Sequence, residues 1–240
     1  MTITASPSAT AVPAPSDLAP IVVDLYRDIH KGIRAELFAA TLDAGRADPA
    51  DDAGRTALDA QVNDLVRFLG QHAEHEDGAI QPVLEIELPD LAERVAREHV
   101  GLEGRMVRLA EIAQVARVAP DHHQRLRVHQ LHVELAAFTS EYLAHQDLEE
   151  RVVMPALEQA VGAEAVVAIH AAIVGPMPPE ELMASLAVMV PAMNVEDRVE
   201  LLTGMRESAP PEAFEAVLGL VRSVLEPAGA RAVSRRLGVA

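Results

Sequence analysis

The sequence contains no cysteine. This absence excludes disulfide bonds, thiolate nucleophiles, iron–sulfur clusters and cysteine-ligated zinc. A metal could therefore be held only by histidine and carboxylate side chains, and the chain has 10 His and 37 Asp or Glu. The composition leaves one type of metal site open, a site built from imidazole and carboxylate ligands.

Aromatic residues are also scarce. They make up 2% of the 240 residues and tryptophan is absent, whereas half of the chain is hydrophobic. The core must therefore be built mainly from Ala, Leu, Val, Ile and Met. Because such a composition is poor in bulky strand-forming residues, it favours helices over strands. We predict an all-α fold.

Positive charge is in short supply, since 20 Lys or Arg face 37 Asp or Glu and the formal net charge is -17. A surface this acidic repels phosphate backbones and anionic lipids, so we expect no nucleic-acid and no membrane partner. Charged residues interrupt every apolar run before about 20 residues, the length that a transmembrane helix needs. The first twenty residues lack the basic and apolar regions of a secretory signal. The expected compartment is the cytoplasm.

The chain divides into three predicted parts. Residues 1–16, rich in Pro, Ala and Ser, are expected to form a flexible tail. Residues 17–160 carry four long stretches of helically spaced apolar residues, which predict an up-down-up-down four-helix bundle. Residues 163–240 have shorter apolar runs broken by prolines, which predicts a small C-terminal helical appendage. The sequence shows no chemical motif in this appendage and identifies no protein partner for it.

Cap and breaker residues set the predicted boundaries of the four helices. The first helix is expected to be capped at Ser16-Asp17 and the fourth at Asp121. Pro82 and Pro155 are expected to lie within the second and fourth helices. The loops between the helices are expected around residues 45–52, 88–90 and 119–121.

A repeated motif lies within the predicted bundle. His72 and Glu76 form an HxxxE pair, as do His145 and Glu149, and each pair is followed at the same interval by Pro-x-Leu. A further histidine precedes each pair, 42 residues earlier at His30 and 46 residues earlier at His99. The repeat indicates a duplicated helix pair.

The spacing of the motif predicts a metal site. Residues i and i+4 share one helix face, so the imidazole and the carboxylate of HxxxE can reach the same point. A single core histidine is more often satisfied by a neighbouring polar group. Four core-facing imidazoles and two carboxylates, however, would leave several unpaired groups, each costing roughly 1–3 kcal/mol. Such a ligand set suits Fe, Mn or Zn, and two bridging carboxylates favour a dinuclear centre with a vacant position.

The pattern of these six residues with the trailing Pro-x-Leu resembles the hemerythrin or HHE cation-binding family over about residues 17–160. The resemblance implies two non-haem iron ions joined by an oxo or hydroxo bridge. It also implies the distribution of the ligands, with His30 and His72 on one iron, His99 and His145 on the other, and Glu76 and Glu149 bridging.

The chain departs from the oxygen-carrying hemerythrins, which have HxxxH on the third helix and HxxxxD on the fourth. Here the third helix has His99-x-x-x-Glu103, so Glu103 is a candidate additional ligand and reversible oxygen carriage is not expected. The arrangement is similar to hemerythrin-like proteins of actinobacteria and to an F-box iron sensor. This resemblance implies reaction with or binding of O2, peroxide or NO, including catalase-like peroxide decomposition, or iron sensing.

Two tyrosines and several other histidines complete the candidate residues. Tyr26 and Tyr142 lie one turn before His30 and His145, so each hydroxyl could hydrogen-bond an oxygen ligand at the metals, or could simply pack with its tip in water. The remaining histidines of the predicted bundle are expected to be solvated: His75, His122, His123, His129 and His132.

Two rival interpretations are weighed against the hemerythrin-like one. A ferritin-like oxidase would need Glu-x-x-His motifs, and the sequence has none. A structural helical interaction protein, with incidental histidines and a functional appendage, does not explain the doubled motif. Between an enzyme and a non-catalytic iron, oxygen or gas sensor the sequence does not decide.

Overall fold

The computed structural model describes residue 18 and residues 21–239. The predicted tail and the predicted cap at Ser16-Asp17 lie outside these residues. All regular elements described are helices and none is a strand, which confirms the all-α prediction. The elements are α1 (Arg27–Arg46), α2 (Asp52–Ala79), α3 (Gln81–Glu87), α4 (Pro89–Arg117), α5 (Gln124–Leu148), the π-helix η1 (Glu149–Val153), α6 (Met154–Val161), α7 (Ala163–Val174), α8 (Pro179–Ala192), α9 (Val195–Ser208), α10 (Pro211–Val224) and α11 (Pro227–Leu237).

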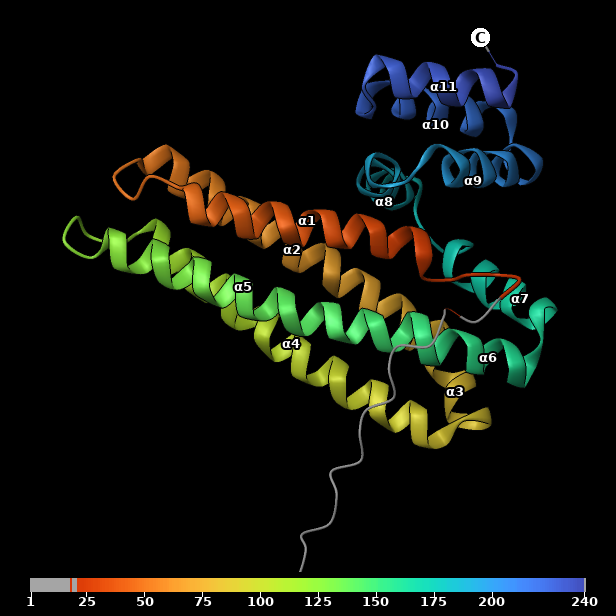
Figure 1. Cartoon of the computed structure of the whole chain (residues 1–240), viewed down its shortest axis with the longest axis horizontal. Coiled ribbons are helices and arrows are strands. Elements are labelled where there is room, and N and C mark those ends of the chain that lie inside the picture. Colours follow the sequence, from red (N-terminus) through yellow and green to blue (C-terminus); the bar gives the residue numbers. More distant parts are fainter. Residues whose placement is uncertain (1–17, 19–20, 240) are drawn as a thin grey trace, which may run out of the picture.

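Four long helices form the predicted bundle. Helix α1 packs against α2 and α5, and α4 packs against the same two helices, so the four close around one core (Figure 1). This core is apolar along most of its length, with Leu37, Leu69 and Leu135 among its fully buried members. A second apolar cluster fills the end of the bundle where α3, α6 and α7 meet.

The first helix begins later than predicted. The carboxylate of Asp24 accepts hydrogen bonds from the backbone N–H groups of Tyr26 and Arg27, and α1 starts there. The preceding backbone is non-helical, and the N–H groups of Val22 and Val23 donate to the carboxylate of Glu158 on α6. A helix needs its first N–H groups capped, and Asp24 is the residue that caps them.

The fourth long helix also begins later than predicted. It starts at Gln124, and no side chain caps its first N–H groups. Asp121, the predicted cap, instead accepts a hydrogen bond from the side-chain amide of Gln124. The predicted loop around 45–52 is present, because α1 ends at Arg46 and Asp51 caps α2 by accepting from Ala53 N–H at 3.0 Å.

Two helices predicted to be continuous are interrupted soon after the glutamate of their HxxxE motif. Helix α2 gives way to α3 at Ile80, and α5 passes through η1 before α6 begins. In each case a proline follows, Pro82 or Pro155, which has no N–H to donate to the carbonyl four residues earlier. The repeat thus predicts an interruption of the α-helix shortly after each glutamate. In the second repeat the interruption is a π-helical turn, a feature that is common at functional sites.

Within residues 163–239, the described part of the C-terminal appendage, the structure has five short helices, as the prolines predicted. Helix α7 packs on α2 and α6, α8 packs on α1, and α8–α11 enclose an apolar cluster of their own (Figure 1). Ion pairs tie it to the bundle: Arg27 to Glu200 at 3.2 Å, and Lys31 to Asp197.

Among the described residues, no single helix has the length and apolar character required to cross a membrane. Within the same residues, only the joined segments 124–161 and 163–174, bent by 115°, reach that length and composition together.

Glycine at position 32 allows α8 to approach α1. A Cβ placed on Gly32 would lie 3.1 Å from Val188 Cγ1 and 3.2 Å from Met189 Cα, so the backbone of α8 would have to move. We expect Gly32→Ala to destabilise the protein by about 1–3 kcal/mol through overpacking. The repeat supplies a matched control in Gly101, two residues after His99 as Gly32 is after His30, where an added Cβ would have no atom within 4 Å.

Gly101→Ala should stabilise the protein by about 0.5–1 kcal/mol, because alanine loses less backbone entropy in a helix. Urea unfolding of both variants measures the two changes. Equal shifts of the same sign would show that the close approach of α8 does not matter.

Candidate metal centre

Each long helix of the bundle contributes one histidine to a buried cluster. His30 lies in the first turn of α1, and His72 and Glu76 face the core one turn apart on α2. His99 comes from α4 and His145 from the end of α5, while Glu149 is the first residue of η1. All six side chains are buried. The structure therefore brings together the six residues that the doubled motif singles out, hereafter the six-residue cluster.

The possible ligand atoms fall into two groups that share one residue. Atoms of Glu76, His99, His145 and Glu149 all lie within 4.8 Å of one another. Atoms of His30, His72 and Glu76 form a second group, also within 4.8 Å of one another. The ring centroids of His30 and His72 are 5.3 Å apart, and those of His99 and His145 are 4.9 Å apart.

Glu76 has one carboxylate oxygen near each histidine pair. Its Oε1 lies 3.1 Å from His72 Nε2, and its Oε2 lies 3.4 Å from His99 Nε2.

Glu149 has the same relation to the two pairs. Its Oε2 lies 3.4 Å from His30 Nε2, while its Oε1 lies 3.1 Å from His145 Nε2 and 3.7 Å from His99 Nε2. Two ligands bound about 2.1 Å from one ion at a right angle would be roughly 3 Å apart, so these spacings suit atoms that share a metal.

Unsatisfied polar atoms also point to a cation. His30 Nε2, Glu76 Oε1 and both carboxylate oxygens of Glu149 are buried and accept or donate no hydrogen bond. Buried polar atoms without partners are rare in proteins and call for an explanation. A metal ion would satisfy all four at once, so the residues present fit such a group.

The rings of His99 and His145 give a second indication of the same kind. Each ring faces a carboxylate with its Nδ1, and their Nε2 atoms face each other at 3.1 Å. Burial opposes protonation of both rings, but the neighbouring carboxylates outweigh it and raise the pKa of both, so the metal-free site favours positive charge at this point. A metal cation bound there would supply that charge in place of the protons on Nε2.

Electrostatics within the metal-free cluster differ from residue to residue. Burial and the nearby His30 lower the pKa of His72 to about 3, which leaves its ring neutral and able to bind a metal. Burial and the charge of Glu149 raise the pKa of Glu76. Burial opposes ionisation of Glu149 as well, but the nearby imidazoles of His145 and His99 outweigh it and lower its pKa. Two carboxylates in one buried site thus have opposite tendencies.

Three carboxylates outside the cluster bind histidines of the cluster at the ring nitrogen that points away from it. Each accepts a hydrogen bond from an imidazole Nδ1, and this contact fixes the tautomer that leaves Nε2 free for a metal. The pairs are His30 with Glu150 at 3.0 Å, His99 with Asp77 at 2.8 Å, and His145 with Glu98 at 3.0 Å.

These three carboxylates are absent from the residues predicted from the motif, although the sequence holds a signal for two of them. An acidic residue directly follows the glutamate of each HxxxE motif, Asp77 in the first repeat and Glu150 in the second. The structure shows that each binds the upstream histidine of the other repeat, so Asp77 holds His99 and Glu150 holds His30. The two repeats are therefore joined at the cluster by reciprocal hydrogen bonds.

Glu150 also accepts a hydrogen bond from Arg34, which reaches the same oxygen as His30, at 2.8 Å. Burial raises the pKa of Glu150, but the contacts with His30 and Arg34 outweigh it and lower the pKa to about 2. Glu150 is therefore ionised.

Both candidate tyrosines lie beside the cluster. The Tyr26 ring centroid is 5.1 Å from that of His30, and the Tyr142 centroid is 6.0 Å from that of His145. Burial and the charges of Glu149 and Glu76 raise the pKa of both phenols, so both stay protonated. Both side chains are buried, so they do not reach into water as one alternative predicted. Whether they bond to a ligand stays a prediction.

Glu103 is a correction to the predicted ligand set. Its side chain is exposed on α4, and it belongs to neither group of possible ligand atoms. Although it lies four residues after His99, the metal-facing Nε2 of His99 points into the bundle while its Nδ1 turns to Asp77. The carboxylate that would join His99 from the same helix is therefore replaced by carboxylates from α2.

Two histidines predicted to be solvated make specific contacts instead. His132 is half-buried, and its Nδ1 lies 3.1 Å from the carbonyl oxygen of Thr41 on α1. His75 is also half-buried and lies 3.0 Å from the carboxylate of Glu181 on α8. The others, His122, His123 and His129, are exposed as predicted.

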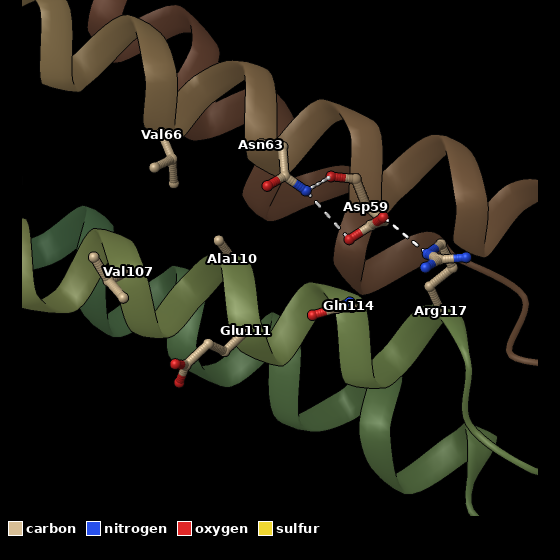
Figure 2. A pocket seen from close by; sticks show the side chains of 8 residues that line it. All are labelled: Asp59, Asn63, Val66, Val107, Ala110, Glu111, Gln114 and Arg117. Carbon is tan, nitrogen blue, oxygen red and sulfur yellow. Dashed lines mark hydrogen bonds and ion pairs between the residues drawn. The ribbon is translucent and has the colours of Figure 1, made fainter.

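Two surface grooves flank α4. One, of about 500 Å³, lies between α2 and α4 and is lined by no histidine; Arg117 pairs there with Asp59 at 3.0 Å (Figure 2). The other, of about 550 Å³, lies between α4 and α5 and is bordered by His145, Glu98 and Arg97. Of these two grooves, the second adjoins the six-residue cluster.

Comparison with protein families yields a match that covers the bundle. The family model described as "Hemerythrin HHE cation binding domain" matches residues 21–157, more than half of the chain, and this stretch contains the whole six-residue cluster. No curated protein and no solved structure matches the chain.

Proposed function

The chain belongs to the hemerythrin HHE cation-binding family, and from this premise we propose that its buried cluster binds two iron ions. His30 and His72 hold one ion, and His99 and His145 hold the other. Glu76 and Glu149 bridge them. Imidazole and carboxylate ligands suit iron among the first-row metals.

One observation carries this proposal. Each of the two glutamates presents a different oxygen to each histidine pair, at 3.1 and 3.4 Å from the nearest imidazole nitrogens. A carboxylate that served a single ion would not need its second oxygen on the opposite pair. The arrangement therefore supports two positions rather than one.

We further propose that the centre reacts with peroxide or O2, with catalase-like decomposition of two H2O2 to two H2O and one O2 as the favoured activity. Bound iron supplies redox chemistry and an open position for a small oxygen ligand. Tyr26 and Tyr142, which stay protonated, can donate hydrogen bonds to that ligand. The buried surroundings limit the access of water. The small ligand, the cytoplasmic setting and the lack of nucleic-acid and membrane partners belong to the same proposal.

Oxygen evolution tests the catalase-like activity. Iron-loaded protein mixed with hydrogen peroxide should release O2, and His145→Ala should reduce the rate at least about 10-fold, since it removes a ligand. Glu103→Gln, on the exposed face of the same bundle, should leave the rate unchanged. Iron content per chain is measured on the same samples, with two irons expected. A wild-type rate no higher than that of His145→Ala would refute the activity.

A second candidate function, a non-catalytic sensor of iron, O2 or NO, is favoured by the way the appendage docks. Lys31, next to His30, pairs with Asp197 on α9, and His75, next to Glu76, pairs with Glu181 on α8. Two residues adjacent to the cluster thus hold the appendage. A sensor would change the amide hydrogen exchange of α8 and α9 when iron or NO binds, whereas an enzyme alone would not.

A purely structural role is the weakest candidate. It would leave four imidazoles and two carboxylates buried at one point without a function. Burial of such groups is costly unless they are paired.

A further inference from the structure

The two histidine pairs receive unequal support from the carboxylates behind them. His99 and His145 are each backed by one, Asp77 and Glu98. In the other pair only His30 is backed, by Glu150, and no described residue bonds to His72 Nδ1. The inference that follows rests on the proposed two-ion centre. We propose that its two metal positions differ in affinity, and that Glu98 is a positioning residue that makes the His99/His145 position bind metal more tightly.

The repeat shows where the symmetry is lost. His30-Lys-Gly-Ile in the first repeat corresponds to His99-Val-Gly-Leu in the second, so the residue before each histidine is equivalent. That residue is Glu98 in the second repeat and Ile29 in the first. Glu98 reaches across from α4 to His145 on α5. An isoleucine at the equivalent point cannot accept a hydrogen bond, which leaves His72 without a carboxylate.

The arginines near these carboxylates add to the difference. Arg34 donates to the same Glu150 oxygen that accepts from His30, so the negative charge of this oxygen is divided between the two side chains. Arg94 also pairs with Glu98, but through the other oxygen, at 3.1 Å. The oxygen that faces His145 is therefore left to that histidine alone.

The physical consequence is a stronger ligand field at one position. A carboxylate that accepts the Nδ1 proton fixes the ring orientation and makes Nε2 a better donor to metal. Loss of such a partner typically lowers metal affinity by about 10–100-fold. We therefore expect ferrous iron to bind in two steps whose dissociation constants differ by roughly that factor.

Equilibrium dialysis of the metal-free protein with ferrous iron, without oxygen, measures both steps. Glu98→Ala should weaken the tighter step about 10–100-fold and leave the weaker step in place. Glu98→Gln keeps an acceptor for the Nδ1 proton without the charge, so it should recover part of the loss. Glu150→Ala should act on the weaker step instead. Glu103→Gln, exposed on the same helix as Glu98, is the matched control and should change neither step.

Mössbauer spectra of protein loaded with the iron-57 isotope provide a readout that a general loss of stability would not change selectively. Wild-type protein at one iron per chain should show one dominant quadrupole doublet, with a second appearing on further loading. Glu98→Ala should alter the first of these. Two ions bound with equal affinity, or equal weakening of both steps by Glu98→Ala, would overturn this inference alone. Saturation at one ion per chain would overturn the two-ion proposal, and this inference with it.

Discussion

Removal of iron with a chelator is expected to lower the melting temperature of the protein by roughly 15–30 °C. A ligand present at 1,000 times its dissociation constant stabilises the folded state by about 4 kcal/mol per site, and two sites are proposed. For a chain of this size each kcal/mol corresponds to about 2–4 °C. The physical reason is that metal-free folding leaves His30 Nε2 and both oxygens of Glu149 buried without hydrogen bonds.

Thermal unfolding followed by far-ultraviolet circular dichroism, with and without iron, measures this shift. The control is a His72→Ala and His145→Ala double variant, which loses one histidine from each pair and should melt at the same temperature in both conditions. A wild-type melting temperature unaffected by iron would mean that the cluster does not bind iron in the folded state.

The six-residue cluster could be predicted because its geometry is local in the sequence. The i, i+4 spacing of HxxxE fixes His72 beside Glu76 on any helix, and the same holds for His145 and Glu149. The repeat then places the two helix pairs in equivalent positions. Apolar spacing sets which face of each helix turns inward, so the histidines in register with it had to meet in the core.

The three carboxylates that accept from the histidine Nδ1 atoms, Asp77, Glu98 and Glu150, could not be predicted in the same way, because their contacts join different helices. Glu98 and Asp77 lie on partly exposed faces of α4 and α2. Apolar spacing identifies only residues that face the core, so it does not identify these two. Their contacts with the Nδ1 atoms depend on how closely the helices pack and on how each helix is rotated about its axis. The acid after each HxxxE motif was the one signal available.

The start of α1 shows a different limit of the pattern. Ile21, Val22 and Leu25 have spacing compatible with a helix. The structure instead packs Ile21, Val23 and Leu25 against the apolar cluster at the end of the bundle and leaves Val22 exposed, which is the alternation of an extended segment. Apolar spacing alone therefore does not give the start of α1, because the helix start is set by a cap, here Asp24.

The contacts between the appendage and the bundle also could not be predicted from the sequence. His75 and Lys31 are polar residues on exposed-looking helix positions, and nothing near them in the chain identifies Glu181 or Asp197 as partners. The sequence does contain Gly32 in a helix interior, where alanine would be favoured. An unexplained glycine of this kind marks close approach of another element, in this case α8.

Glu76→Gln should separate the stability of the bare fold from its affinity for iron. In the metal-free protein, burial and the charge of Glu149 raise the pKa of Glu76, so much of the population already carries a neutral side chain near pH 7. A neutral amide of the same shape should then change the metal-free melting temperature little. Iron binding needs the ionised carboxylate, so the iron-dependent stabilisation should fall by more than half and iron affinity by at least about 10–100-fold.

The pH dependence of the metal-free protein gives this prediction an independent check. A carboxyl group whose pKa is raised by folding contributes no penalty below its ordinary pKa, and stability is lost as the pH rises through the raised value. Wild-type metal-free protein should therefore lose stability as the pH increases from about 5 upward, and Glu76→Gln should lose less. Glu103→Gln, exposed on α4 and outside the cluster, is the control and should keep this loss. If Glu76→Gln bound iron as wild type does, Glu76 would not be a ligand, and the carboxylate of Glu149 alone would have to join the two histidine pairs.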